Sequence, residues 1–126
     1  MGKFVIKQTK TGFTFSLKAG NGETIATGRE AFQSIDRVKS EINNVMNSAP
    51  DAAVEDQTIE GYQTEKHPKF EIYSDKAGEF WFRLKDADGQ VIAISEGYTA
   101  KANCKNGIES VKKNSVGAAV IEPENP

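Results

Sequence analysis

The fold is decided by a stretch that occurs twice, as Phe80-Trp81-Phe82-Arg83-Leu84-Lys85 and, 67 residues earlier, as Phe13-Thr14-Phe15-Ser16-Leu17-Lys18. In both copies Phe, Phe and Leu take every second position, as in a strand with one buried face. The flanking sequence recurs too, because Phe4-Val5-Ile6-Lys7 returns as Phe70-Glu71-Ile72-Tyr73 at a spacing of 66 residues. A similarity sustained over the chain indicates an internal duplication, so we expect two copies of one structural unit.

Each copy is predicted to contain three strands, a helix and a last strand. In the first copy the strands cover residues 3–8, 13–18 and 23–27, and Gly and Asn residues between them suit hairpin turns. From about Gln33 the apolar period changes from two to about 3.6, which predicts an amphipathic helix. Residues 52–56 then form a short last strand. The unit is therefore β-β-β-α-β.

The second copy repeats this order, with its third strand at 90–94 and its last at 117–122. Its helix places Cys104 and Ile108 on one apolar stripe, and Thr99 is the expected N-cap. Gly107 interrupts this helix at a cost of about 1 kcal/mol relative to alanine. We therefore expect a close approach of another element at Gly107.

The predicted class is α+β, with residues 1–126 in a single compact domain. Repeat 1 covers 3–56, a polar linker 57–68 and repeat 2 69–122. One repeat alone is too short to bury a sizeable core, so the two are expected to share one. We predict one mainly antiparallel sheet with both helices on the same face.

The charge balance is almost neutral, with 16 Lys and Arg against 18 Asp and Glu. Charges of both signs are spread evenly over the two halves, which disfavours a nucleic-acid or anionic-membrane partner. The N-terminal Met-Gly-Lys-Phe-Val-Ile lacks the apolar core of a secretory signal, and no apolar run approaches the length of a membrane helix. We expect a soluble, cytoplasmic and monomeric protein.

Three stretches of the second copy resemble the YegP-like family of uncharacterised bacterial and archaeal proteins: 88–93 (DGQVIA), 95–101 (SEGYTAK) and 104–112 (CKNGIESVK). The first copy departs from this pattern, with Arg29-Glu30-Ala31-Phe32 before its helix and Glu41 in place of the helix glycine. The resemblance implies that two units, as tandem repeats or as two subunits, join in one sheet and exchange their C-terminal strands. It implies no activity, and it supplies no catalytic residues.

Few residues are suited to catalysis. His67 is the only histidine and lies in the polar linker, where it is predicted to be solvated. Cys104 is the only cysteine and is expected to behave as a small buried hydrophobe. No ligand spacing for a metal or cofactor is present, so we expect neither. Glu30 and Glu96 recur at the same place before each helix and are candidates for an acid and base pair, although interaction with the helix N-terminus explains them better.

The sheet face turned away from the helices is the best candidate for binding. Alternation sends Tyr73, Trp81, Arg83 and Lys85 to that face, which two helices leave open. Aromatic and Arg side chains are common interface anchors, but cross-strand aromatic pairs also stabilise sheets. A second candidate is the segment that contains Glu96, Tyr98 and Lys101.

The leading functional hypothesis is a non-enzymatic binding or protein-interaction module with a protein or small-molecule partner. The alternative is single-stranded nucleic-acid binding by stacking on Trp81, against which the near-neutral charge counts. An enzyme that uses Glu30 and Glu96 ranks last.

Overall fold

The computed structural model describes residues 2–122 and gives the β-β-β-α-β order twice. Repeat 1 contains β1 (Lys3–Thr9), β2 (Gly12–Lys18), β3 (Thr24–Thr27), α1 (Ile35–Ser48) and β4 (Ala53–Asp56). Repeat 2 contains β5 (Lys69–Ser74), β6 (Phe80–Lys85), β7 (Val91–Ile94), α2 (Lys101–Ser115) and β8 (Ala119–Ile121). Within the described residues, neither helix has the length and apolar character needed to cross a bilayer.

The strands form one sheet in the order β4-β5-β6-β7-β3-β2-β1-β8. Each three-stranded meander is antiparallel, and β3 pairs antiparallel with β7 where Thr27 lies opposite Ile94. This central pair joins the two repeats into a continuous sheet. The predicted α+β class and mainly antiparallel sheet are confirmed.

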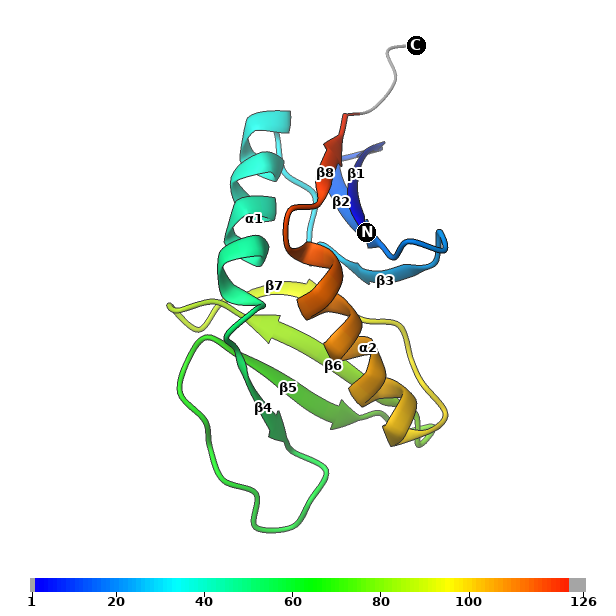
Figure 1. The fold of residues 1–126 in the computed structure, drawn as a ribbon, viewed down its shortest axis with the longest axis vertical. Helices are drawn as coiled ribbons and strands as arrows, with labels where there is room; N and C mark the ends of the chain where they lie inside the picture. Colours follow the sequence, from blue (N-terminus) through cyan, green and yellow to red (C-terminus); the bar gives the residue numbers. More distant parts are fainter. Residues whose placement is uncertain (1, 123–126) are drawn as a thin grey trace.

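The C-terminal strands of the two repeats are exchanged within the chain. Strand β4 of repeat 1 pairs in parallel with β5 of repeat 2, and β8 of repeat 2 pairs in parallel with β1 of repeat 1. Figure 1 shows β8 beside β1 at one end of the molecule and β4 beside β5 at the other. Each repeat thus completes the sheet of the other.

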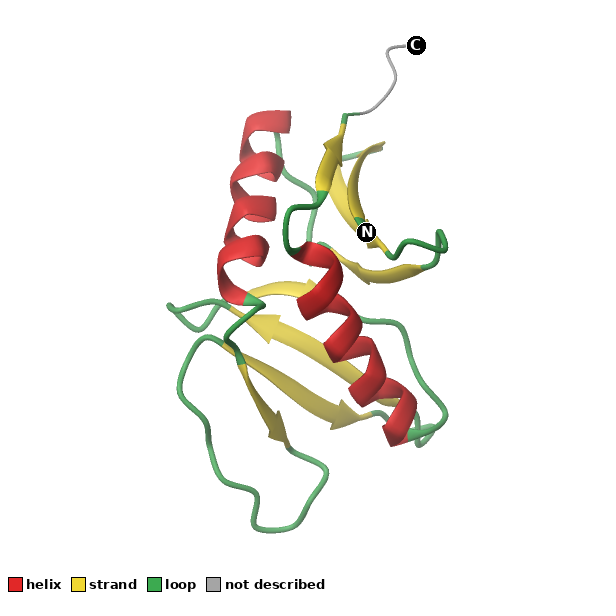
Figure 2. Ribbon diagram, viewed as in Figure 1, coloured by secondary structure: helices red, strands yellow, loops and turns green. Residues whose placement is uncertain are grey.

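Both helices cover the same face of the sheet, and the core lies between these two layers (Figure 2). Its largest side chains form two equivalent edge-to-face pairs, Phe4 with Phe15 and Phe70 with Phe82, each with ring centroids 5.8 Å apart. All four rings are fully buried. Burying a Phe side chain contributes about 1.5–3 kcal/mol, so both repeats contribute to one shared core.

The two helices begin at equivalent positions but are capped differently. Helix α1 follows Ser34, whose hydroxyl accepts a hydrogen bond from the Arg37 backbone N–H at 3.2 Å. The prediction of Thr99 as the cap of α2 is wrong, because the helix begins one residue later, after Ala100, which makes no side-chain capping bond. The backbone of Tyr98 still pairs with Phe80 in both directions, and this strand-like pairing delays the turn into the helix.

Residues 57–68, the predicted linker, form the return connection between two parallel strands. A parallel pair requires a crossover of about a dozen residues, because the chain must travel back to the start of the second strand. The backbone N–H of Glu65 reaches the Glu55 side chain at 2.7 Å, on the sheet face away from the helices. We call that face the outer face. The expectation of an open outer face is therefore wrong at β4 and β5.

Candidate functional site

The structure brings four of the predicted binding residues together on the outer face. Strands β5 and β6 pair with Tyr73 opposite Trp81, and Arg83 and Lys85 continue along β6 on the same face. Phe70 and Ile72 of β5 and Phe82 and Leu84 of β6 alternate with them, point to the helices and are fully buried. Alternation along each strand is therefore sufficient to gather the set.

The aromatic residues of this set are held in place by polar neighbours. The Arg83 guanidinium lies over the Tyr73 ring, 4.5 Å from its centroid. The Trp81 indole N–H donates a 2.7 Å hydrogen bond to the Asp75 carboxylate, and this bond holds the pKa of Asp75 below its ordinary value. Both rings are half-buried, so each keeps part of its surface available for contact.

An ionic cluster lies beside the aromatic pair. The Lys69 ammonium contacts the Glu55 carboxylate at 2.8 Å and the Glu71 carboxylate at 3.3 Å. Glu71 also receives Arg83 at 2.6 Å and Lys85 at 3.1 Å. Glu55, Lys69 and Glu71 are no more than 4% exposed. We call these five residues the ionic cluster.

The pKa values of the cluster follow from this geometry. Burial alone would raise the pKa of Glu55, but hydrogen bonds from Lys69, Gln57 and the Glu65 backbone outweigh it and lower the pKa to about 2. Burial would lower the pKa of Lys69, but the two carboxylates raise it. Burial would also raise the pKa of Glu71, but hydrogen bonds from Arg83 and Lys85 and their charges lower it. All three groups are charged at neutral pH.

On the outer face, the charged strand side chains that solvent can reach are cationic. The six basic strand residues on this face are Lys3, Lys7, Lys18, Lys69, Arg83 and Lys85. The acidic residues on the outer face of the described strands are Glu55 and Glu71, and both are 2% exposed and paired. Lys3 and Lys7 are exposed, and Lys18 is half-buried. The net charge of −2 therefore conceals an uneven distribution.

The segment with Glu96, Tyr98 and Lys101 does not join this set. The Tyr98 ring stacks on Phe82, with centroids 6.4 Å apart, on the helix side of the sheet. Lys101 contacts Asp56 at 3.0 Å and so ties α2 to the exchanged strand β4. Glu96 is exposed. Tyr98 and Lys101 thus have structural partners.

The predicted close approach at Gly107 is confirmed. A Cβ atom at this position would lie 2.5 Å from the Tyr98 hydroxyl and 2.9 Å from the Phe82 ring. Helix α2 can pack onto this pair because the position has no side chain. The same helix buries Cys104 completely, and burial raises the pKa of its thiol to about 11, so the thiol is protonated at neutral pH.

Glu30 and Glu96 do not form an acid and base pair. They follow β3 and β7, which pair antiparallel, so the chain leaves the central pair in opposite directions. Glu30 instead lies beside Arg29 at 3.7 Å, in the wall of a cavity next to α1. The neighbour of Glu96, Gly97, packs against Glu79 and Trp81. The enzyme hypothesis built on this pair is therefore wrong.

Sequence reasoning missed the ionic cluster. Glu71 lies opposite Arg83 in the hairpin, and a cross-strand charge pair at this register was open to prediction. Glu55 is more than a dozen residues away and reaches the cluster only because β4 pairs with β5. No local pattern reports such a contact.

Comparison with known proteins gives similarities over both repeats. A family described as a domain of unknown function, DUF1508, matches residues 9–56 and 75–122. A UPF0339 protein of Treponema denticola is 59% identical over 54 residues, which cover 43% of this chain and 93% of that relative. The relative is thus about as long as one repeat.

Two further similarities cover the whole duplicated chain. The UPF0339 protein YegP of Yersinia pestis is 31% identical over 121 residues, which cover 95% of this chain and 94% of the relative. The solution NMR structure of yegP from E. coli, described as a protein of unknown function, aligns with a TM-score of 0.79 and 29% identity. That alignment covers 99% of this chain and 95% of the E. coli chain. These similarities support the fold, and the descriptions of these two proteins name no activity.

Proposed function

The chain belongs to the DUF1508 family, a family of unknown function, and we propose that it is a non-enzymatic binding module that holds single-stranded nucleic acid on its outer sheet face. The observation that supports this most is the uneven charge. Every acidic strand residue of that face within residues 2–122 is buried in the ionic cluster, whereas cations remain accessible. This face attracts an anionic chain despite the net charge of −2.

The cations form two groups on the outer face. Arg83 and Lys85 lie on β6, and Lys3, Lys7 and Lys18 lie on β1 and β2, with β7 and β3 between them. Neighbouring strands are about 4.8 Å apart, so β6 and β2 are separated by about 14 Å. A single strand of a few nucleotides laid across the sheet can contact both groups through its phosphates. This favours an extended polyanion over a compact anion.

The aromatic pair supplies the second feature of such a surface. Proteins that bind single strands combine a cationic groove with aromatic rings on which bases stack, each worth about 1–3 kcal/mol. Trp81 and Tyr73 lie next to the first cationic group and are half-buried. Asp75 and Glu79 lie beside Trp81 at the turn of the hairpin, away from Arg83. The bound nucleic acid is therefore expected to extend from the Trp81 ring toward Arg83.

Fluorescence anisotropy with a labelled twelve-nucleotide oligouridine tests the proposal. With about four phosphates contacted, the logarithm of the binding constant should fall with the logarithm of salt at a slope of about −3. Lys18→Gln should weaken binding several-fold and reduce this slope by about 0.7. Lys113→Gln removes the same charge from an exposed site on α2 and is the matched control.

Two outcomes would contradict the proposal. The first is binding that vanishes at physiological salt, and the second is an equal loss in the Lys18 and Lys113 variants. The remaining explanation is that an acidic protein surface binds the same cations, and Trp81 fluorescence distinguishes that partner from a nucleic acid. Stacked bases quench the indole, whereas a purely ionic partner that stays off the ring leaves its emission unchanged.

A further inference from the structure

A polar cavity of about 470 Å³ lies between α1, the segment before it and the start of β7. Its size is within the range of roughly 300–1,000 Å³ typical of small-molecule sites. Helix α1 supplies Glu41 and Asn44, the preceding segment supplies Glu30, and repeat 2 supplies Gln90. The cavity is thus built where the two repeats meet, away from the outer face.

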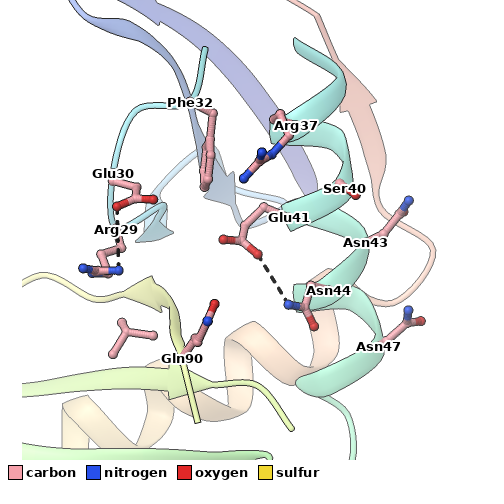
Figure 3. A pocket seen from close by; sticks show the side chains of 11 residues that line it. Arg29, Glu30, Phe32, Arg37, Ser40, Glu41, Asn43, Asn44, Asn47 and Gln90 are labelled. Carbon is pink, nitrogen blue, oxygen red and sulfur yellow. Dashed lines mark hydrogen bonds and ion pairs between the residues drawn. The ribbon is translucent and has the colours of Figure 1, made fainter. Parts of the chain in front are cut away.

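Groups of both charges point into this cavity. In Figure 3 the carboxylates of Glu30 and Glu41 approach from opposite sides, and the Arg37 guanidinium enters from one end beside Phe32. The Gln90 amide approaches from the side opposite Arg37. Arg29 also lines the cavity, with its guanidinium 3.7 Å from the Glu30 carboxylate. The cavity therefore combines two carboxylates, two guanidinium groups and amide groups that can donate or accept.

Two of the charged groups of the cavity, Glu41 and Arg37, are incompletely satisfied by the protein, whereas Glu30 is paired with Arg29. The Glu41 carboxylate accepts a long 3.4 Å hydrogen bond from Asn44, and neither Glu41 nor Arg37 takes part in an ion pair within residues 2–122. Burial raises the pKa of Glu41, and the carboxylates of Asp86 and Glu30 add to this effect, which the Asn44 hydrogen bond and the Arg37 charge only partly offset. A cation bound beside Glu41 would reverse this effect.

The equivalent place beside α2 shows that the fold does not require these charges. There the counterpart of Glu41 is Gly107, and the Tyr98 ring fills the space against it. Repeat 1 has Phe32 in place of Tyr98, and its ring lies beside Arg37 at 5.8 Å. The site beside α2 is closed by packing, whereas the site beside α1 is open and charged.

We propose that this cavity binds a small zwitterion of the α-amino-acid type, with its ammonium group between Glu30 and Glu41 and its carboxylate at Arg37. A simple cation would meet the Arg37 guanidinium, and a simple anion would meet the two carboxylates. A ligand with both charges satisfies both ends at once. The Gln90 amide is placed to contact its remaining polar atoms.

Backbone NMR spectra of the full chain, recorded with each standard amino acid in turn, test the proposal. At about 10 mM each ligand would saturate a site with millimolar Kd. At least one amino acid should shift the amides of Phe32, Glu41 and Asn44. Its N-acetyl and carboxamide derivatives, each lacking one charge, should bind at least tenfold more weakly. The Glu41 carboxyl pKa should fall when the ligand binds.

Three variants complete the test. Glu41→Gln and Arg37→Gln should each weaken binding at least tenfold while the rest of the spectrum keeps its folded dispersion. Glu109→Gln, at an exposed position of α2, is the matched control and should bind as the parent chain does. The proposal is overturned if no amino acid shifts these amides, or if the blocked derivatives or the Glu41 variant bind equally well. A failure of nucleic-acid binding on the outer face would leave this result unaffected.

Discussion

In repeat 2 the return segment passes over the outer face, and the charged side chains beneath it are buried and paired, whereas at the matching corner of repeat 1 the described side chains are more exposed. There Lys3 is exposed in the place of Lys69, and Val5 and Ile121 take the places of Glu71 and Glu55. The strand pairing is the same at both corners. Within residues 2–122 the difference lies in the side chains at these positions and in how deeply they are buried.

This comparison shows how one backbone can give a charge two different roles. Under a cover, each charge needs partners, because an unpaired buried charge is very costly. Without a cover, the lysines remain hydrated and available to an anionic partner. The buried cluster also removes the acidic groups of this face from solvent, which leaves the accessible charge cationic.

Loss of Lys69 is expected to have the largest effect. Lys69→Met leaves Glu55 and Glu71 buried without their shared cation and should lower the free energy of unfolding by about 3–5 kcal/mol. Lys3→Met changes the equivalent exposed residue and should stay within about 0.5 kcal/mol. Urea unfolding of both variants measures the contrast. Equal losses of unfolding free energy in the two variants would show that burial of the lysine does not determine its contribution to stability.

Acidification should remove stability through repeat 2. The pKa of Glu55 is about 2 in the folded protein against an ordinary 4.5. Its contribution of about 3 kcal/mol is therefore complete above pH 4.5 and lost as the pH falls toward 2. Between pH 6 and pH 3 urea unfolding should show a loss of about 2 kcal/mol, because folded Glu55 is still mostly ionised at pH 3, and Lys69→Met should largely abolish this loss. A Glu55 carboxyl that titrates at 4.5 or above by NMR would refute the assignment.

The helix glycine gives the next contrast. Gly107→Ala places a methyl group against Tyr98 and Phe82 and should lower the free energy of unfolding by about 1–3 kcal/mol. Glu41→Ala, at the matching position of α1, should change it by less than about 0.5 kcal/mol. Thermal and urea unfolding provide the measurement. A neutral Gly107→Ala variant would mean that Tyr98 moves aside freely.

The stack of Arg83 on Tyr73 should make the smallest difference. Arg83→Lys keeps the charge beside Glu71 but loses the planar group over the ring, which should cost about 0.5–1 kcal/mol. Lys85→Arg is the control, because it preserves a cation at Glu71 with no stack to lose. Urea unfolding compares the two. If the Arg83→Lys variant is as stable as the control, the stack of Arg83 on Tyr73 does not contribute to stability.

Much of the fold was open to prediction from local patterns. The alternation of Phe13, Phe15 and Leu17 identified a strand and its inner face, and the change to a helical period identified α1. The helix boundary at Thr99 was mispredicted, because pairing of Tyr98 with Phe80 extends the strand-like segment and depends on a neighbouring hairpin.

The candidate site was predicted only in part. Alternation placed Tyr73, Trp81 and Arg83 on one face, since neighbouring residues of a strand point to opposite sides. It did not predict that Glu71 pairs with Arg83, or that Tyr98 packs on the helix side of the sheet. The cavity beside α1 was missed, because its walls come from both repeats.

The amino-acid sequence by itself determined the duplication, the strands and helices of each repeat and the face to which each side chain points. These depend on the periodicity of residues near one another in the chain. The tertiary structure alone decided which strands cross between repeats, that the return segment covers β4 and β5, and that Glu55 meets Lys69. These features depend on contacts between residues that are far apart in the sequence. Such contacts form because folding removes side chains from water, and the local sequence pattern does not show which distant residues will meet.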